Sequence, residues 1–139
     1  MYRLLIVDDE EDIRSGMSKG IPWSEWGFTV VGVAENGEEA VFLTEKEKPD
    51  VVLSDIRMPK MDGIELMQYL HDNLPEIKIV ILSGYNDLEY LNMAIKNQVT
   101  EYMLKPTDID EFEQLFRKIR QNLDEEKNRR EELNQLKLA

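Results

Sequence analysis

The sequence has 139 residues, 42% of them hydrophobic, which is enough for one domain with a buried core. Its net charge of −12 argues against direct binding to nucleic acid, and the absence of cysteine excludes disulfides, thiolate metal sites and a cysteine nucleophile. No apolar run approaches the roughly 20 residues needed to cross a bilayer, and no export signal follows Met1, so we expect a cytoplasmic protein without membrane contact.

Five short apolar runs alternate with segments of helical spacing, as in βα units around a mostly parallel sheet. Several runs are apolar at consecutive positions, which favours strands that helices cover on both faces. The runs span Leu4–Val7, Thr29–Ala34, Val51–Leu53, Ile77–Leu82 and Tyr102–Leu104. The pattern predicts an α/β fold, a doubly wound (βα)5 parallel sheet.

Five helices are predicted around these runs. The first begins just after Asp9 and ends near Gly20, and an aromatic loop at Trp23–Gly27 follows it. Asn36 is the predicted N-cap of the second helix. The other helices are expected over Gly63–Asn73, from Asn86 or Asp87 onward, and from about Asp108, with Ile109, Phe112, Phe116, Ile119 and Leu123 forming one apolar stripe.

The pattern changes after Leu123, because residues 124–132 include no apolar side chain. Acidic and basic residues there stand four apart, which is typical of an exposed helix. We therefore predict a domain over residues 1–123 and an extended helical linker over residues 124–139. Leu133 and Leu136 resume an apolar spacing, so the end of this helix is either solvated or part of a dimer seam.

Polar residues stand where the predicted strands end. Asp8 and Asp9 follow the first run, Asp55 the third, Ser83 the fourth and Lys105 the fifth. The carboxyl ends of parallel strands lie on one edge, where doubly wound sheets bind ligands, and strand order 2-1-3-4-5 opens a crevice between strands one and three. The three aspartates are therefore expected to converge.

Converging carboxylates repel one another unless a cation neutralises them, and Mg²⁺ suits an all-oxygen site that also holds phosphate. Lys105 and Ser83 would each contact an oxygen of a phosphoryl group, which makes Asp55 a candidate nucleophile. Each residue alone has an ordinary explanation as a helix cap, turn residue or solvated charge. Their joint position at four strand ends favours a common site.

Five ordered blocks of this sequence resemble the signature blocks of response-regulator receiver domains. The blocks are Leu5–Glu10, Pro49–Pro59, Met61–Gly63, Leu82–Tyr85 and Tyr102–Pro106. The resemblance spans roughly residues 2 to 123 and implies the flavodoxin-like form of the doubly wound fold, with strand order 2-1-3-4-5. Finer features around Trp23, Trp26–Phe28, Glu35–Ala40 and Ser83–Asp87 are similar to regulators with an AraC-type DNA-binding output domain.

The resemblance implies a role for each residue of the site. Asp55 would be the phosphoacceptor, and Mg²⁺ would be bound by Asp8, Asp9, Asp55 and the backbone carbonyl of Arg57. Ser83 and Lys105 would bind the phosphoryl group, and Tyr102 would be the switch aromatic, although a core aromatic without a switching role is the open alternative. The bond before Pro106 is expected to be cis.

The same resemblance implies a sensor histidine kinase as partner and a response in the face of the fourth helix, fifth strand and fifth helix. A homodimer through that face or the C-terminal helix is a further expectation. Because no helix-turn-helix follows Leu123, we favour a receiver fragment over a stand-alone receiver, with DNA bound only by an output domain. Two alternatives to this non-enzymatic switch stay open, a Mg²⁺-dependent phosphohydrolase and a degenerate receiver that acts as a scaffold.

Overall fold

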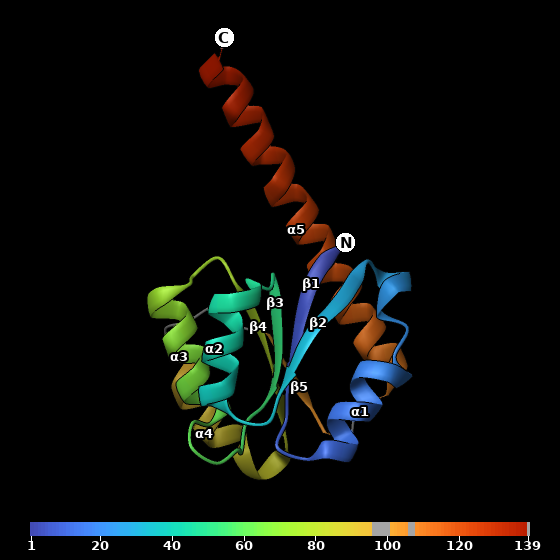
Figure 1. Ribbon diagram of the computed structural model, residues 1–139, viewed down its shortest axis with the longest axis vertical. Helices are drawn as coiled ribbons and strands as arrows, with labels where there is room; N and C mark the ends of the chain where they lie inside the picture. The colour runs from blue at the N-terminus through green and yellow to red at the C-terminus, as the bar shows by residue number, and fades with distance from the viewer. Residues whose placement is uncertain (96–100, 106–107, 139) are drawn as a thin grey trace. The chain divides into compact units, whose positions relative to one another are not determined.

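The computed structural model describes residues 1–95, 101–105 and 108–138. The chain divides into two compact units, Met1–Thr107 and Asp108–Ala139. The first unit is built on a five-stranded sheet (Figure 1). Its strands are β1 Tyr2–Val7, β2 Phe28–Ala34, β3 Val51–Asp55, β4 Lys78–Ser83 and β5 Glu101–Leu104.

All four neighbouring strand pairs are parallel, and the spatial order is β2-β1-β3-β4-β5. The predicted doubly wound sheet of order 2-1-3-4-5 is therefore confirmed. Each strand end also lies within two residues of its prediction. In this order β1 and β3 are neighbours, and the helices that follow them lie on opposite faces of the sheet (Figure 1). Doubly wound folds bind ligands at the carboxyl edge of the sheet at such a point.

Helices cover both faces of the sheet in the first unit. Figure 1 shows α2 and α3 on one side and α1 on the other. The helical segments are α1 Glu11–Gly20, α2 Gly37–Glu47, α3 Gly63–Asn73 and α4 Leu88–Ile95, with short 3₁₀ turns η1 Trp23–Trp26 and η2 Tyr85–Asp87. The predicted Asn36 cap is confirmed, since its side chain accepts a hydrogen bond from the Glu39 N–H at 2.9 Å.

One core cluster lies between the sheet and helices α2, α3 and α4. Its central members are alternate strand residues and the inner faces of the helices, among them Leu5, Val7, Val52, Ile81, Ala40, Leu66, Met67, Leu70 and Leu91. The intervening strand residues, such as Ile6 and Leu53, are fully buried as well. Burial on both faces explains why the strands are apolar at consecutive positions.

Two local predictions were wrong. The expected loop at residues 23–27 is a 3₁₀ turn, because Trp23 and Trp26 are buried edge to face at 5.4 Å and the Trp23 indole N–H donates to the Met17 carbonyl at 2.7 Å. Ile109 was expected to be buried on the inner stripe of the last helix, but it lies in the first turn of that helix and is 48% exposed. The bond before Pro106 lies outside the described residues.

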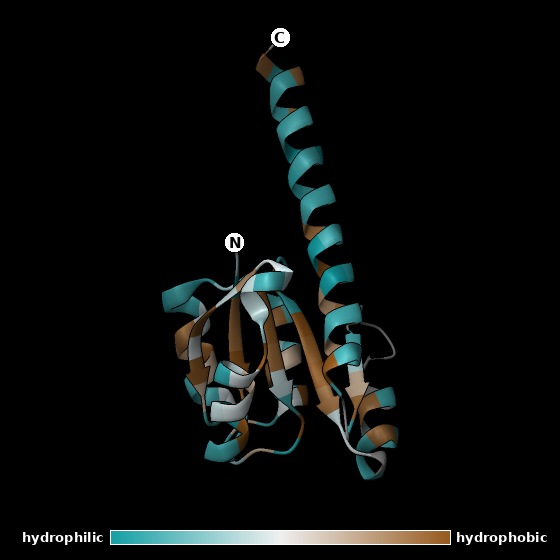
Figure 2. Ribbon diagram, turned by 90° about the vertical axis from the view of Figure 1, so that its right-hand side faces the viewer, coloured by the Kyte–Doolittle hydropathy of each residue, from teal (hydrophilic) through white to brown (hydrophobic). Residues whose placement is uncertain are grey.

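The second unit contains α5, which runs from Ile109 to Leu138. Phe112, Phe116, Ile119 and Leu123 are buried, as the stripe predicts. Beyond Leu123 the helix is mostly hydrophilic (Figure 2), and Leu133 and Leu136 are exposed. The extended C-terminal helix is confirmed, whereas a domain boundary after residue 123 stays a prediction because α5 passes through it unbroken. Among the described helices, none has the length and apolarity required to span a bilayer.

Candidate functional site

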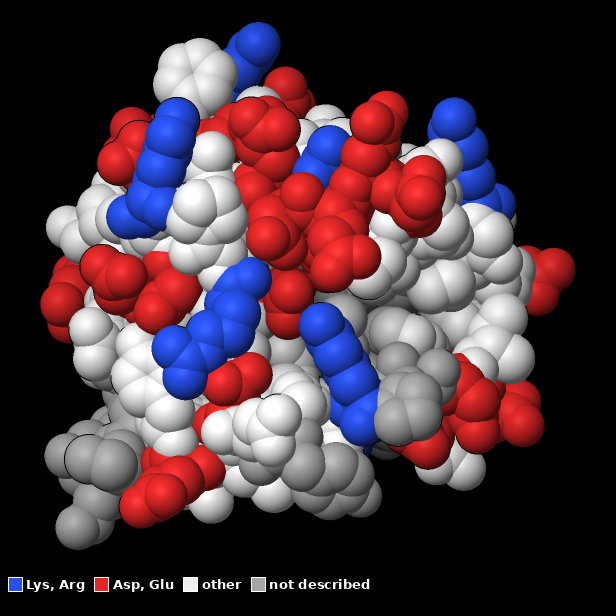
Figure 3. All heavy atoms as spheres, turned by 90° about the horizontal axis from the view of Figure 1, so that it is seen from below, with Lys and Arg blue, Asp and Glu red and all other residues white. Residues whose placement is uncertain are grey.

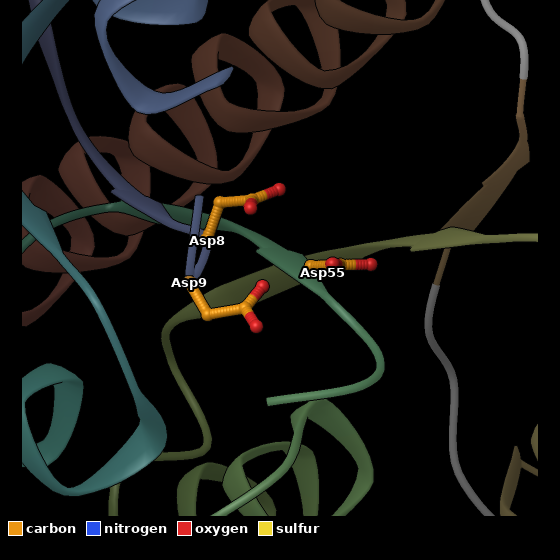
Figure 4. Close-up of side chains that lie close together, drawn as sticks. All are labelled: Asp8, Asp9 and Asp55. Carbon is orange, nitrogen blue, oxygen red and sulfur yellow. The ribbon is translucent and has the colours of Figure 1, made fainter. Parts of the chain in front are cut away.

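Three aspartates meet at the carboxyl edge of the sheet, between β1 and β3. Asp8 and Asp9 directly follow β1, and Asp55 is the last residue of β3. Each offers a carboxylate oxygen within 4.8 Å of the other two. Figure 4 shows the three side chains converging on one space. We call Asp8, Asp9 and Asp55 the carboxylate cluster, and its convergence agrees with the prediction from the strand ends.

Asp8 is the most constrained member of the cluster. It is fully buried, and its Oδ1 accepts a hydrogen bond from the Glu10 N–H at 2.9 Å. Burial raises the pKa of Asp8 to about 6, the Glu10 hydrogen bond opposes this, and the negative charges of Asp55 and Asp9 add to it. Oδ2 of Asp8 is also buried but accepts no hydrogen bond within the described part of the chain. Burying a polar oxygen without a hydrogen-bond partner costs folding free energy, and a bound ligand at this atom would reduce that cost.

Asp55 is held from two directions. Its Oδ1 accepts hydrogen bonds from the backbone N–H of Ile56 and from Nζ of Lys105, both at 2.8 Å. Lys105 follows β5 and is 38% exposed, whereas the Asp55 side chain is 10% exposed. Burial lowers the pKa of Lys105, but the hydrogen bond and charge of Asp55 outweigh it, so the pKa is raised overall. The ammonium group is therefore charged at neutral pH beside the central carboxylate.

The loop after β3 passes close beneath Asp55. The Gly63 N–H donates to the Ile56 carbonyl at 2.8 Å, and a Cβ on Gly63 would overlap the carbonyl oxygen of Asp55. Asp62 then starts α3 with a capping box, in which it accepts from the Glu65 N–H at 2.9 Å. The Asp62-Gly63 pair thus has two specific roles, because Asp62 caps α3 and Gly63 leaves room for the backbone of Asp55.

Strand register places the other predicted residues at the same edge. Asp55 pairs with Leu82 and Ser83 pairs with Leu104, so Ser83 lies between the ends that carry Asp55 and Lys105. The Ser83 hydroxyl is buried and donates to the Gly84 carbonyl at 3.0 Å. Tyr102 lies three residues before Lys105 in β5 and is 42% exposed.

The side chain of Arg57 turns to a different partner. Its Nε donates to Oδ1 of Asp87 at 2.7 Å, and its guanidinium lies 4.9 Å from the ring centre of Tyr90. No local pattern in the sequence indicates this contact, because the partner of Arg57 lies 30 residues away in a turn of ordinary composition. Asp87 and Tyr90 are the neighbours of the site that sequence reasoning missed.

The residues present fit a divalent cation. All three candidate ligands are hard carboxylate oxygens. Oδ2 of Asp8 is buried and accepts no hydrogen bond from the described residues, and burial together with repulsion from Asp55 and Asp9 raises the pKa of Asp8. A cation would offset this repulsion and satisfy that oxygen. Figure 3 views the face from below Figure 1, where acidic side chains gather near the middle with basic side chains beside them. The face is thus suited to a cation and to a basic partner surface.

Comparisons with known proteins agree with this geometry. Residues 4–117 match the family model described as response regulator receiver domain. A response regulatory protein of Staphylococcus epidermidis is 38% identical over 116 residues, which cover 84% of this chain and 45% of that protein. The transcriptional regulatory protein HptR of Staphylococcus aureus is 34% identical over 128 residues, with coverage of 92% and 50%. The chain therefore spans about half the length of these relatives.

Solved structures give the same result. The receiver (REC) domain of AraT, a response regulator from Geobacillus stearothermophilus, has a TM-score of 0.83 and 39% identity, covering 91% of this chain and 98% of that one. A two component transcriptional regulator AraC from Clostridium phytofermentans has a TM-score of 0.80 and 38% identity, covering 87% and 94%. The resemblance noted in the sequence is confirmed, and the chain belongs to the response regulator receiver domain family.

Proposed function

We propose that this receiver domain accepts a phosphoryl group on Asp55 from a sensor histidine kinase, with Mg²⁺ bound at the carboxylate cluster. Receiver domains generally bind Mg²⁺ at an acidic pocket. The observation that carries the proposal is the meeting of three carboxylates with one ammonium group, in which Lys105 Nζ lies 2.8 Å from Asp55 Oδ1. A cation site beside a paired carboxylate and a lysine is suited to phosphoryl transfer.

Each residue of the site has its own role in the proposed phosphoryl transfer. Asp8, Asp9, Asp55 and the carbonyl of Arg57 would hold Mg²⁺, which supplies charge neutralisation to the transferred group. A carboxylate oxygen of Asp55 attacks phosphorus, forming an O–P bond as the P–N bond to the donor histidine breaks. Lys105 neutralises a phosphoryl oxygen, and the Ser83 hydroxyl donates to another.

The response to phosphorylation begins at the same residues. Ser83 has a short, buried side chain at the end of β4, and its hydroxyl must leave the Gly84 carbonyl to reach a phosphoryl oxygen. Movement of this strand end would permit the exposed ring of Tyr102 to turn inward, which changes the surface of α4 and β5. This surface or the C-terminal helix would then form a homodimer.

In this proposal a separate output domain, outside this chain, carries out the response. Both relatives described above are regulators about twice as long as the aligned segment, and one is named as a transcriptional regulator. DNA binding would therefore belong to a separate output domain, and the acidic receiver would act on it indirectly. This chain would be a regulator with self-catalysed phosphoryl transfer, not a metabolic enzyme.

Intact-mass measurement after incubation with acetyl phosphate and Mg²⁺ tests the chemistry. The expected product is one phosphoryl adduct on the protein that disappears in Asp55→Asn. Asp72→Asn is the matched control, because it makes the same change on an exposed residue of α3 and should keep the adduct. An adduct that survives in Asp55→Asn would contradict the assignment. No adduct at all would favour a scaffold, and turnover of many phosphate esters per protein would favour a phosphohydrolase.

A further inference from the structure

An ionic and aromatic contact joins the loop after β3 to the start of α4. Arg57 pairs with Asp87 at 2.7 Å, where the arginine side chain is 62% exposed and the aspartate side chain 17% exposed. The same guanidinium lies over the ring of Tyr90, 4.9 Å from its centre. Arg57 thus contacts both η2 and α4, the two elements that follow β4. We call Arg57, Asp87 and Tyr90 the arginine latch.

A second bond runs between the same elements. The Tyr90 hydroxyl donates to Oδ2 of Asp62 at 2.9 Å, and the other oxygen of Asp62 caps α3. Burial raises the pKa of Tyr90 and the hydrogen bond to Asp62 raises it further, so the phenol remains a donor at neutral pH. The start of α4 is therefore attached to the β3–α3 loop at two points.

Arg57, the first residue of the latch, stands two residues after Asp55. A phosphoryl group on Asp55 would add negative charge at that point of the chain. Guanidinium binds phosphoryl oxygens through paired, charge-assisted hydrogen bonds, which a single carboxylate contact through Nε does not match. An exposed ion pair of this kind contributes little free energy and is exchanged readily. The Arg57 side chain is 62% exposed and that of Asp87 is 17% exposed, so the arginine has more room than the aspartate to change partners.

We propose that Asp87 and the phosphoryl group on Asp55 compete for the guanidinium of Arg57. In the unmodified protein Arg57 holds Asp87 and the start of α4 against the acceptor loop. Phosphorylation transfers Arg57 to the phosphoryl oxygens, which releases Asp87 and loosens the start of α4. The side chain of Arg57 thus connects the chemistry at the acceptor to the position of α4. This inference rests on the proposed function of Asp55.

A double-mutant cycle tests the competition. The probe is beryllofluoride, an anionic mimic of the acyl phosphate, titrated calorimetrically in excess Mg²⁺. Asp87→Asn frees Arg57 and should tighten beryllofluoride binding about two- to fivefold, the range expected for loss of one exposed ion pair. In the Arg57→Gln background the same Asp87→Asn change should have no effect. The cycle separates competition for Arg57 from simple removal of a negative charge.

Glu89→Gln is the matched control, because it removes a carboxylate from the exposed face of α4 two residues after Asp87. It should leave beryllofluoride affinity within experimental error. Hydrogen exchange provides the second readout, and amides at the start of α4 should exchange faster in unmodified Asp87→Asn than in the wild type. Beryllofluoride should bring the wild type to the rate of that variant.

The outcomes distinguish the inference from the function on which it rests. Equal tightening by Asp87→Asn in both backgrounds, or none in either, overturns the competition while Asp55 remains the acceptor. If the wild type neither binds beryllofluoride nor gains the acetyl phosphate adduct, the proposed function fails and the competition fails with it. Unchanged exchange at α4 in Asp87→Asn would likewise overturn the latch.

Discussion

Lys105 Nζ donates to Oδ1 of Asp55 across the carboxyl ends of three neighbouring strands, at 2.8 Å. The two residues are 50 positions apart in the chain, and β4 lies between their strands. The lysine partly neutralises a cluster of three carboxylates, and it stands beside the carboxylate that we propose as the nucleophile. This pair therefore links the charge balance of the unmodified site to its chemistry.

Removal of that ammonium group should slow phosphorylation. Lys105→Gln removes the ammonium group beside Asp55 that would neutralise charge on the transferred group, so the rate with acetyl phosphate should fall about 10- to 100-fold. The rate is measured by intact mass against time at saturating Mg²⁺. Lys118→Gln on α5 is the control and should retain the wild-type rate. A Lys105→Gln rate within twofold of wild type would contradict this role.

The raised pKa of Asp8 predicts an unusual pH dependence of the free energy of unfolding. Its pKa in the folded protein is about 6, above the reference value of 3.8, because of burial and the neighbouring carboxylates. The folded state therefore binds this proton more tightly than the unfolded state. The resulting stability is complete below pH about 4 and is lost as the pH rises through about 6.

Metal-free Asp8→Asn should accordingly be more stable than the wild type at pH 7.5, by about 1 to 3 kcal/mol. At pH 4.5 the difference should shrink to about a third, because Asp8 is then protonated in the folded wild type but still mostly ionised in the unfolded chain. Urea denaturation at the two pH values, in buffer stripped of divalent ions, measures it. A variant that is less stable than the wild type at pH 7.5 would exclude an uncompensated buried charge.

Mg²⁺ should stabilise the folded protein through the carboxylate cluster. At a concentration ten times its Kd, an ion that binds only the folded state adds about 1.4 kcal/mol to the free energy of unfolding. The thermal midpoint should therefore rise with Mg²⁺ and return when the ion is chelated. Asp9→Asn should reduce this rise, since it removes one of the three carboxylates. Asp72→Asn should preserve it, and an equal loss in both variants would place the ion elsewhere.

The strand ends were readable from the sequence because their signals are local. Each apolar run stops at a polar residue, and the geometry of parallel strands brings Asp8 and Asp55 to one edge. The aromatic turn at Trp23 and Trp26 was missed because it depends on burial of two indoles and not on turn composition. The Arg57–Asp87 pair was missed for a related reason, since an ion pair between distant loops leaves no periodic pattern.

Gly63 supplies a prediction about the loop beneath Asp55. A methyl group at this position would overlap the Asp55 carbonyl oxygen, which belongs to the backbone and cannot rotate away. Gly63→Ala should therefore destabilise the protein by about 1 to 3 kcal/mol and displace the acceptor loop. Because the loop sets the position of the Asp55 side chain, phosphorylation should slow as well. Denaturant unfolding and the acetyl phosphate adduct rate measure the two effects.

Gly16→Ala is the matched control for this substitution. Gly16 lies within α1, and a Cβ there meets no atom within 4 Å. Alanine should stabilise that helix by about 0.5 to 1 kcal/mol, since glycine is the weaker helix former, and the phosphorylation rate should not change. The same chemical change is thus expected to act in opposite directions at the two positions. If Gly63→Ala matched Gly16→Ala in stability and rate, the close approach of the loop to Asp55 would have no part in holding the acceptor.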